Sequence, residues 1–273
     1  ISGNASGVGN WAFRGCSILT KVTLPDTITT IAQQSFQNCS ALKEIHIPEG
    51  VTSIGNYAFS NCTSIEKLSL PDSVKSLGLN VFANCTNLKE IHLSAGLTNL
   101  GDTCLSNCSS LEKVELPKGL TSISKSAFNG CSSLTTIQIP ASVTEIKSRA
   151  FYKCNALSAI YFSNEECPAI AADAFGYIKE GSLCVYIPEN ATGYTENALI
   201  TKISSHLYST KVIASVNCII PGKEQYTCLL HENCESNYEK TLLAKEHQPG
   251  ELVSENVVPA TSEKEGSYDE VCY

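Results

Sequence analysis

The sequence predicts an α/β solenoid of about eight stacked coils with short parallel strands, because one unit recurs along the chain at a fixed offset. A cysteine returns every 23 residues without insertion or deletion, flanked three residues on either side by apolar residues. These cysteines are Cys16, Cys39, Cys62, Cys85, Cys108, Cys131 and Cys154. A unit this short cannot bury its own apolar face and must pack it against the next copy.

Each copy contains a short strand after its cysteine. In the third copy Leu68 and Leu70 alternate with polar neighbours, which is the period of a strand with one buried face. Pro71 follows directly after Leu70, the last residue of the strand that faces the core. At this position its missing N–H does not remove a hydrogen bond between strands. A second apolar pair, Val74 and Leu77, predicts a second strand or extended segment.

The residue before each cysteine is usually asparagine or glycine, the types that tolerate a positive φ. A short helical turn, residues 57–60 in the third copy, is therefore expected to end there. Lys153 departs from this pattern and predicts a different geometry in the last regular copy.

The unit A-F-x-N-C-x-S-L-x-x-I-x-I-P-x-x-V-x-x-I, repeated over residues 11–188, resembles the BspA-like leucine-rich repeats of bacterial surface proteins. The resemblance implies a right-handed, curved leucine-rich-repeat horseshoe on a secreted or cell-surface protein. It also implies adhesion or protein binding and no catalysis.

Composition narrows the classes of function. The chain has 273 residues, a net charge of −8 and a pI near 5.2, which argues against a nucleic-acid surface because phosphate binding needs clustered Lys and Arg. No apolar run approaches the length of a membrane span. Residues 1–10 are rich in glycine and serine and are expected to be flexible. The absence of an N-terminal cap before Trp11 suggests a fragment or a processed form, cut from a longer protein.

The seven cysteines of the column are expected to be free thiols. Equivalent residues of neighbouring coils lie about 4.8 Å apart with parallel Cβ vectors, whereas a disulfide needs Cβ atoms about 3.8 Å apart and facing each other. A buried column offers no converging geometry for a metal either. The thiols should act as small buried hydrophobes.

The polar residues of the first strands should face solvent on the inner, concave face. Two columns alternate in sign from coil to coil, as in Lys67 and Glu90, and predict a ladder of ion pairs that sets the register. A third column is chemically irregular, and irregularity in a regular repeat is where recognition can lie. Its candidate binding residues are His46, Ser69, His92, Glu115, Gln138 and Tyr161.

No catalytic, cofactor or metal site is predicted. His46 and His92 lie two coils apart, about 10 Å, which is too far to share a metal ion. The sequence contains no phosphate-binding glycine loop, no G-x-S-x-G and no H-E-x-x-H.

The repeat changes after Ile160. Residues 164–188 look like an atypical eighth unit, and Gly193 to Ile213 predicts an amphipathic helical segment that caps the solenoid, with Leu199, Ile203 and Leu207 at helical spacing. We therefore expect a domain of residues 1–215. A small Cys-containing module of β type, truncated at its end, should follow over residues 216–273.

The state of the module's cysteines stays open between free thiols, a disulfide such as Cys228 with Cys234, and a Cys₃His zinc site. The residues concerned are Cys218, Cys228, Cys234, Cys272 and His247.

The resulting functional prediction is a non-catalytic binding or adhesion module on a bacterial surface or secreted protein. It would engage a protein or glycan partner, from a host or a bacterium, through the concave face. The alternatives are a structural spacer and the targeting arm of a larger surface protein or enzyme.

Overall fold

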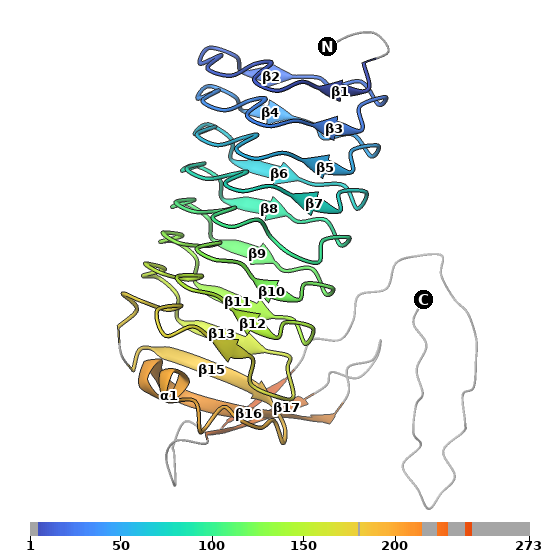
Figure 1. The fold of residues 1–273 in the computed structure, drawn as a ribbon. Coiled ribbons are helices and arrows are strands. Elements are labelled where there is room, and N and C mark those ends of the chain that lie inside the picture. Colours follow the sequence, from blue (N-terminus) through green and yellow to red (C-terminus); the bar gives the residue numbers. More distant parts are fainter. Residues whose placement is uncertain (1–4, 180, 215–222, 229–237, 242–273) are drawn as a thin grey trace, which may run out of the picture. The chain divides into compact units, whose positions relative to one another are not determined.

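The computed structural model describes residues 5–179, 181–214, 223–228 and 238–241, and the chain divides into two units, Ile1–Leu207 and Tyr208–Tyr273. The first unit is a solenoid whose coils stack in sequence order (Figure 1). The predicted boundary at residue 215 lies outside the described residues and stays a prediction. The same holds for Cys218, Cys234, Cys272 and His247.

Each coil contributes one first strand, and within three groups, β2 with β4, β6 with β8 and β9, and β11 with β13 and β15, these strands pair in parallel with their equivalents in the next coil. Their register follows the repeat, as Leu68 opposite Ile91 and Ile91 opposite Val114 show. The first strands are β2 (Lys21–Val22), β4 (Glu44–Ile45), β6 (Lys67–Ser69), β8 (Glu90–His92), β9 (Lys113–Glu115), β11 (Thr136–Ile139), β13 (Ala159–Phe162) and β15 (Leu183–Pro188).

The predicted second strands also form a parallel row. They are β1 (Gly7–Val8), β3 (Thr30–Ile31), β5 (Ser53–Ile54), β7 (Ser76–Leu77), β10 (Ser122–Ile123), β12 (Glu145–Ile146) and β14 (Ala169–Ile170). The fourth coil has a single bridge here, Asn99 with Ser122. The expectation that residues 1–10 are flexible is wrong for Gly7 and Val8, since Val8 pairs with Ile31 and is buried in the core.

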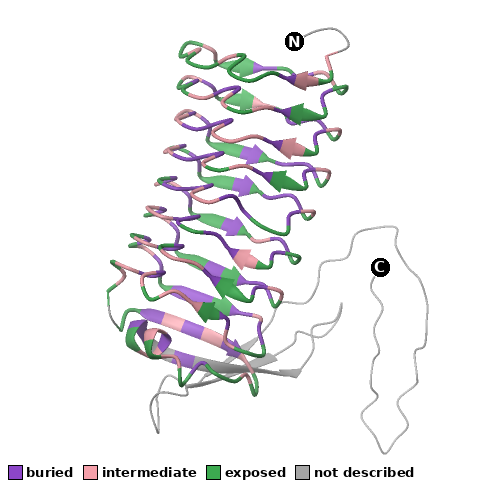
Figure 2. Ribbon diagram, in the orientation of Figure 1, coloured by how far each residue is buried: buried purple, intermediate pink, exposed green. Residues whose placement is uncertain are grey.

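Buried residues recur at equivalent positions in successive coils (Figure 2), and they form columns of similar apolar side chains in the core. The phenylalanine rings stack from coil to coil at centroid distances of 5.2 to 5.7 Å. The stack runs through Phe13, Phe36, Phe59 and Phe82, and resumes through Phe128, Phe151 and Phe175. Leu105 occupies the intervening coil and is fully buried.

The cysteine column is confirmed as a set of free thiols, buried in every coil but the first. Each buried thiol donates to the carbonyl of the phenylalanine or leucine column in the preceding coil, over 3.0 to 3.3 Å. The Phe59 carbonyl, for example, accepts both the Cys62 N–H and the Cys85 thiol, each at 3.2 Å. The thiols therefore join successive coils by hydrogen bonds as well as by packing.

The segment before each cysteine is a pair of tight turns, so the predicted helical turn at residues 57–60 is wrong. Tyr57 has φ +57°, which interrupts any α-helix there, whereas the positive φ expected at the asparagine before the cysteine is confirmed, at +62° for Asn61. Backbone N–H groups alternately bond within the coil, as Ser60 to Tyr57, and to the next coil, as Phe59 to Val81. Lys153 has φ +60° and keeps the same geometry as the asparagines, contrary to prediction.

The predicted eighth coil is formed by β14, a turn that places Phe175 on the ring stack, and β15. The capping segment differs from the prediction, since helix α1 covers only Ala198–Ile203. Ser204 ends it by donating its hydroxyl to the Ile200 carbonyl, and strand β16 (Ser204–Ala214) begins there. Ile200, Ile203 and Leu207 are nevertheless buried.

In the second unit β16 pairs antiparallel with β17 (Lys223–Cys228), and β17 pairs antiparallel with β18 (Tyr238–Thr241). In the part of the chain that the structure describes, no helix has the length and apolarity needed to cross a bilayer.

Candidate binding face

The six candidate residues project from the first strands and are all exposed, as the alternation predicts. They divide between two grooves over this face. A groove of about 790 Å³ includes His46, Ser69 and His92, and a second of about 610 Å³ includes Glu115, Gln138 and Tyr161. A smaller hollow of about 370 Å³ is lined by both His92 and Glu115. That any of them binds a partner stays a prediction.

The second groove is lined in part by Tyr161, whose ring stacks on that of Tyr186 in the next coil. Tyr161 on β13 lies opposite Tyr186 on β15, with ring centroids 4.5 Å apart and planes 7° from parallel. Tyr161 is 37% exposed, and Gln138 lies beside it with its amide 3.4 Å from the Ser163 hydroxyl. Two rings held parallel by paired strands form a rigid, partly apolar surface with polar hydroxyl groups.

The charged columns form ion pairs between adjacent coils. Lys21 meets Glu44 at 2.6 Å, Lys67 meets Glu90 at 2.8 Å and Lys89 meets Glu66 at 2.9 Å. The hydrogen bond from Lys67 lowers the pKa of Glu90, and the more distant charge of Lys113 adds to this effect. The charges over the first groove therefore compensate one another, as a register-setting ladder would.

Replacing Glu90 by lysine tests this role. The new ammonium would lie between Lys67 and Lys113, so we expect Tm to fall by about 1–3 °C, because exposed pairs contribute little and are screened by salt. Glu49→Lys makes the same charge change at an exposed turn and should leave Tm unchanged. Thermal melts at low and high salt check this, and a loss that persists at high salt would contradict it.

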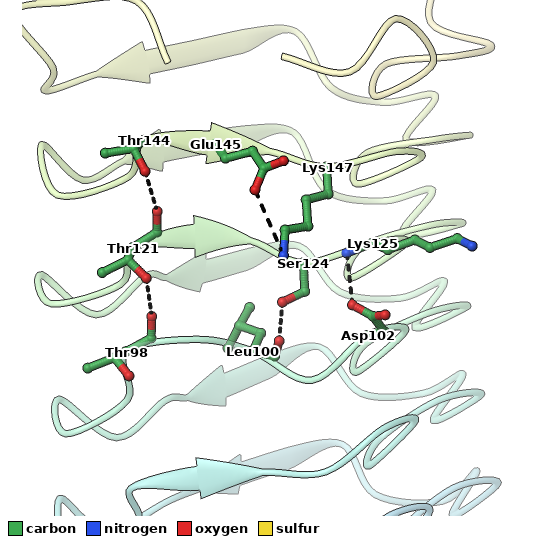
Figure 3. Close-up of polar contacts among 9 residues, drawn as sticks. All are labelled: Thr98, Leu100, Asp102, Thr121, Ser124, Lys125, Thr144, Glu145 and Lys147. Carbon is green, nitrogen blue, oxygen red and sulfur yellow. Dashed lines mark hydrogen bonds and ion pairs between the residues drawn. The ribbon is translucent and has the colours of Figure 1, made fainter. Parts of the chain in front are cut away.

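The side of the solenoid formed by the second strands is organised differently (Figure 3). Threonine hydroxyls donate to carbonyls of the preceding coil, Thr121 to Thr98 at 3.1 Å and Thr144 to Thr121 at 3.3 Å. A hollow of about 440 Å³ lies near Gly101, where a Cβ would be 1.8 Å from the Gly78 carbonyl oxygen, so only glycine fits. These polar groups bond to one another and maintain the register.

Within the described residues, no group of three or more histidine, cysteine or acidic side chains is arranged to hold a metal ion. Burial raises the pKa of the column thiols, to about 11 for Cys39 and about 12 for Cys154. Such thiols are poor nucleophiles because the thiolate is the reactive form.

The main residue that sequence reasoning missed is Tyr186. It follows Tyr161 by 25 residues instead of 23, because the eighth coil contains insertions, so it falls outside the regular column. The signal available in the sequence was the Val185-Tyr186-Ile187 alternation, which matches that of Ile160-Tyr161-Phe162.

The sequence matches the family model of BspA type leucine-rich repeat regions in six copies, over residues 6–115 and 98–219. Among proteins of curated function, none matches.

This chain is also similar to solved structures of leucine-rich repeat proteins. The one from T. pallidum is 28% identical with a TM-score of 0.50, over 54% of this chain and 69% of that one. The one from Bacteroides ovatus is 25% identical with a TM-score of 0.46, over 67% of this chain. The match spans 60% of the length of the B. ovatus protein.

Proposed function

This chain belongs to the BspA-type leucine-rich repeat family, and from that premise we propose that it is a non-catalytic binding module of a cell-surface or secreted bacterial protein. It engages a protein or glycan partner through the concave face. The observation that supports this most is Tyr161, which lines a groove of about 610 Å³ and stacks on Tyr186 of the next coil.

The two grooves differ in how available their side chains are to a partner. Over the first groove the ladder charges are paired with one another, so a partner would have to compete with existing ion pairs. Over the second groove there is one ion pair, Lys113 with Glu115 at 3.0 Å, and the uncharged side chains of Gln138 and Tyr161 project from the next two coils. Tyrosine contributes a large contact area at a small cost in side-chain entropy, and it is enriched among residues that dominate binding energy. The partner is therefore expected at the second groove.

A binding screen with matched variants tests this proposal. Wild-type protein is applied to immobilised extracellular-matrix proteins and to a glycan array, and each hit is titrated. Tyr161→Ala with Tyr186→Ala should weaken binding at least about tenfold, because truncating an aromatic anchor at a binding surface commonly costs more than 1.4 kcal/mol. Circular dichroism and Tm should stay close to wild type, since both rings lie outside the core.

The control is His46→Ala with His92→Ala, which alters the first groove and should change affinity less than twofold. Normal binding by the tyrosine variant would remove the second groove as the site. If the wild-type protein binds nothing in the screen, a spacer role replaces the binding role.

A further inference from the structure

A second cluster of aromatic and charged residues lies in the turns of the last two coils, away from the first strands, with Arg149, Lys153 and Tyr177 exposed and the other two members half-buried. We call Arg149, Tyr152, Lys153, Asp173 and Tyr177 the turn cluster. All five come from the segments that precede β13 and β15, and none lines the grooves of the concave face. Tyr177 is 71% exposed, among the most exposed large side chains of the described chain.

The rings and cations of the turn cluster are arranged around one another. The rings of Tyr152 and Tyr177 meet edge to face, 4.9 Å apart and at 65°. The Arg149 guanidinium lies 5.3 Å from the centre of the Tyr152 ring, and the Lys153 ammonium lies 5.3 Å from that of Tyr177. Lysine and arginine are attracted to the negative faces of aromatic rings at these distances, so the cations are held beside the rings.

The backbone is shaped to allow this arrangement. A Cβ at position 176 would lie 2.6 Å from Cδ2 of Tyr152, so the lack of a side chain at Gly176 leaves room for the tyrosine ring beside the turn of the next coil. Residues of both coils therefore contribute to the turn cluster, and their side chains pack against one another.

The turn cluster carries an excess of positive charge on an acidic protein. Its one carboxylate, Asp173, is engaged by Arg149 at 3.4 Å and by the Ser148 hydroxyl at 3.0 Å. Among the ion pairs within the described residues none includes Lys153, whose ammonium lies over the rings of Tyr152 and Tyr177. Its ammonium has hydrogen-bond donors to offer to an anion.

Lys153 and Tyr177 also occupy an unfavourable backbone position. In earlier coils the equivalent residue is asparagine or glycine, and Asn38, Asn61 and Asn84 hydrogen-bond in a ladder there. Lys153 has φ +60° and Tyr177 φ +70°, a conformation that costs these side chains more than it costs asparagine. Residues that strain the backbone at an exposed position, where asparagine or glycine would fit with less strain, suggest a role other than stability.

These features match an acidic sugar. The C–H face of a pyranose ring packs on an exposed aromatic face, and a carboxylate or sulfate on that ring pairs with the adjacent ammonium or guanidinium. We propose that the turn cluster is a second binding site, separate from the concave face, for an acidic sugar residue of an anionic polysaccharide. Tyr177 supplies the stacking surface, and Lys153 with Arg149 supplies the charge.

The test uses polygalacturonate and dextran sulfate as probes, with methyl-esterified polygalacturonate and dextran as their neutral counterparts. Wild-type protein should be retarded in affinity electrophoresis by at least one anionic polymer and by neither neutral one. The two anionic probes distinguish carboxylate from sulfate recognition. The double variant Lys153→Asn with Tyr177→Asn should lose at least tenfold in affinity.

The asparagine substitutions separate binding from folding. They install the residue that this position carries in other coils, so Tm should be unchanged or higher. Tyr161→Ala with Tyr186→Ala should keep the polysaccharide binding, which distinguishes this site from the concave face. The proposal fails if neither anionic polymer binds, if the asparagine variant binds normally, or if polyglutamate binds as tightly and so indicates an acidic protein as the partner.

Discussion

At pH 10 the solenoid is expected to unfold, because its buried thiols keep their protons in the folded chain and lose them in the unfolded one. Burial raises the pKa of Cys39 to about 11 and of Cys104 and Cys154 to about 12. Burial also raises the pKa of the remaining buried thiols of the cysteine column. These are Cys62, Cys85, Cys108 and Cys131.

The direction of the effect follows from proton linkage. An unfolded thiol has a pKa of about 8.5, so the contribution of each buried thiol is fully present below that pH and is lost as pH rises towards the folded value. At pH 10 each thiol favours unfolding by about 2 kcal/mol, and together they rival the 5–15 kcal/mol that stabilises an ordinary domain.

Urea unfolding between pH 7.5 and 9.5 measures this linkage. Cys62→Ala should reduce the steepness of the alkaline decline by about 0.7 kcal/mol per pH unit averaged over this range, because an unfolded thiol of pKa about 8.5 goes from about one tenth to about nine tenths ionised across it. Phe59→Ala destabilises without removing a thiol and should leave the slope as it is. An unchanged slope in the cysteine variant would show that Cys62 ionises equally in both states.

Phe59→Ala should lower the free energy of unfolding by about 3–5 kcal/mol, since the ring is fully buried between two others. The residual cavity would lie between the rings of Phe36 and Phe82, so the ring stack would be interrupted between the second and fourth coils. Ile18→Ala is the control, because Ile18 is 90% exposed and its loss should stay within about 0.5 kcal/mol. A cost below 1 kcal/mol for Phe59→Ala would mean that the ring stack is not a continuous core.

The columns could be predicted from the sequence because their spacing is strictly periodic. Cys62, Phe59 and Leu68 recur at one offset, and a stack of identical units is the arrangement that buries them all. The hydrogen bond from each thiol to a carbonyl could not be predicted in this way, since it depends on how the neighbouring coil presents its backbone. The free state of the thiols followed from strand spacing alone.

The local errors have a common physical origin. Residues 57–60 suggested a helical turn, but a positive φ at Tyr57 lets alternate N–H groups reach the next coil, and tertiary hydrogen bonds outweigh local propensity. At the cap, Leu199, Ile203 and Leu207 have helical spacing and the last two are buried, yet the chain changes from helix to strand at Ser204.

The candidate site was predictable only in its regular part. His46, Gln138 and Tyr161 fall on one column, so their exposure on one face followed from period-two alternation. Tyr186 and Tyr177 lie beyond insertions that break the 23-residue offset, and only the strand register and turn geometry bring them beside Tyr161 and Tyr152. The two aromatic pairs that support the proposals therefore occur where the repeat is least regular.

Footprinting of tyrosines in the complex tests most directly the claim that the concave face binds while the columns only hold the coils together. Once the screen identifies a partner, hydroxyl-radical oxidation of free and bound protein is compared residue by residue. We predict that Tyr161 and Tyr186 are protected in the complex while Tyr57, a turn residue of the third coil, is oxidised as before. Unchanged oxidation of Tyr161 and Tyr186 in a saturated complex would contradict the account.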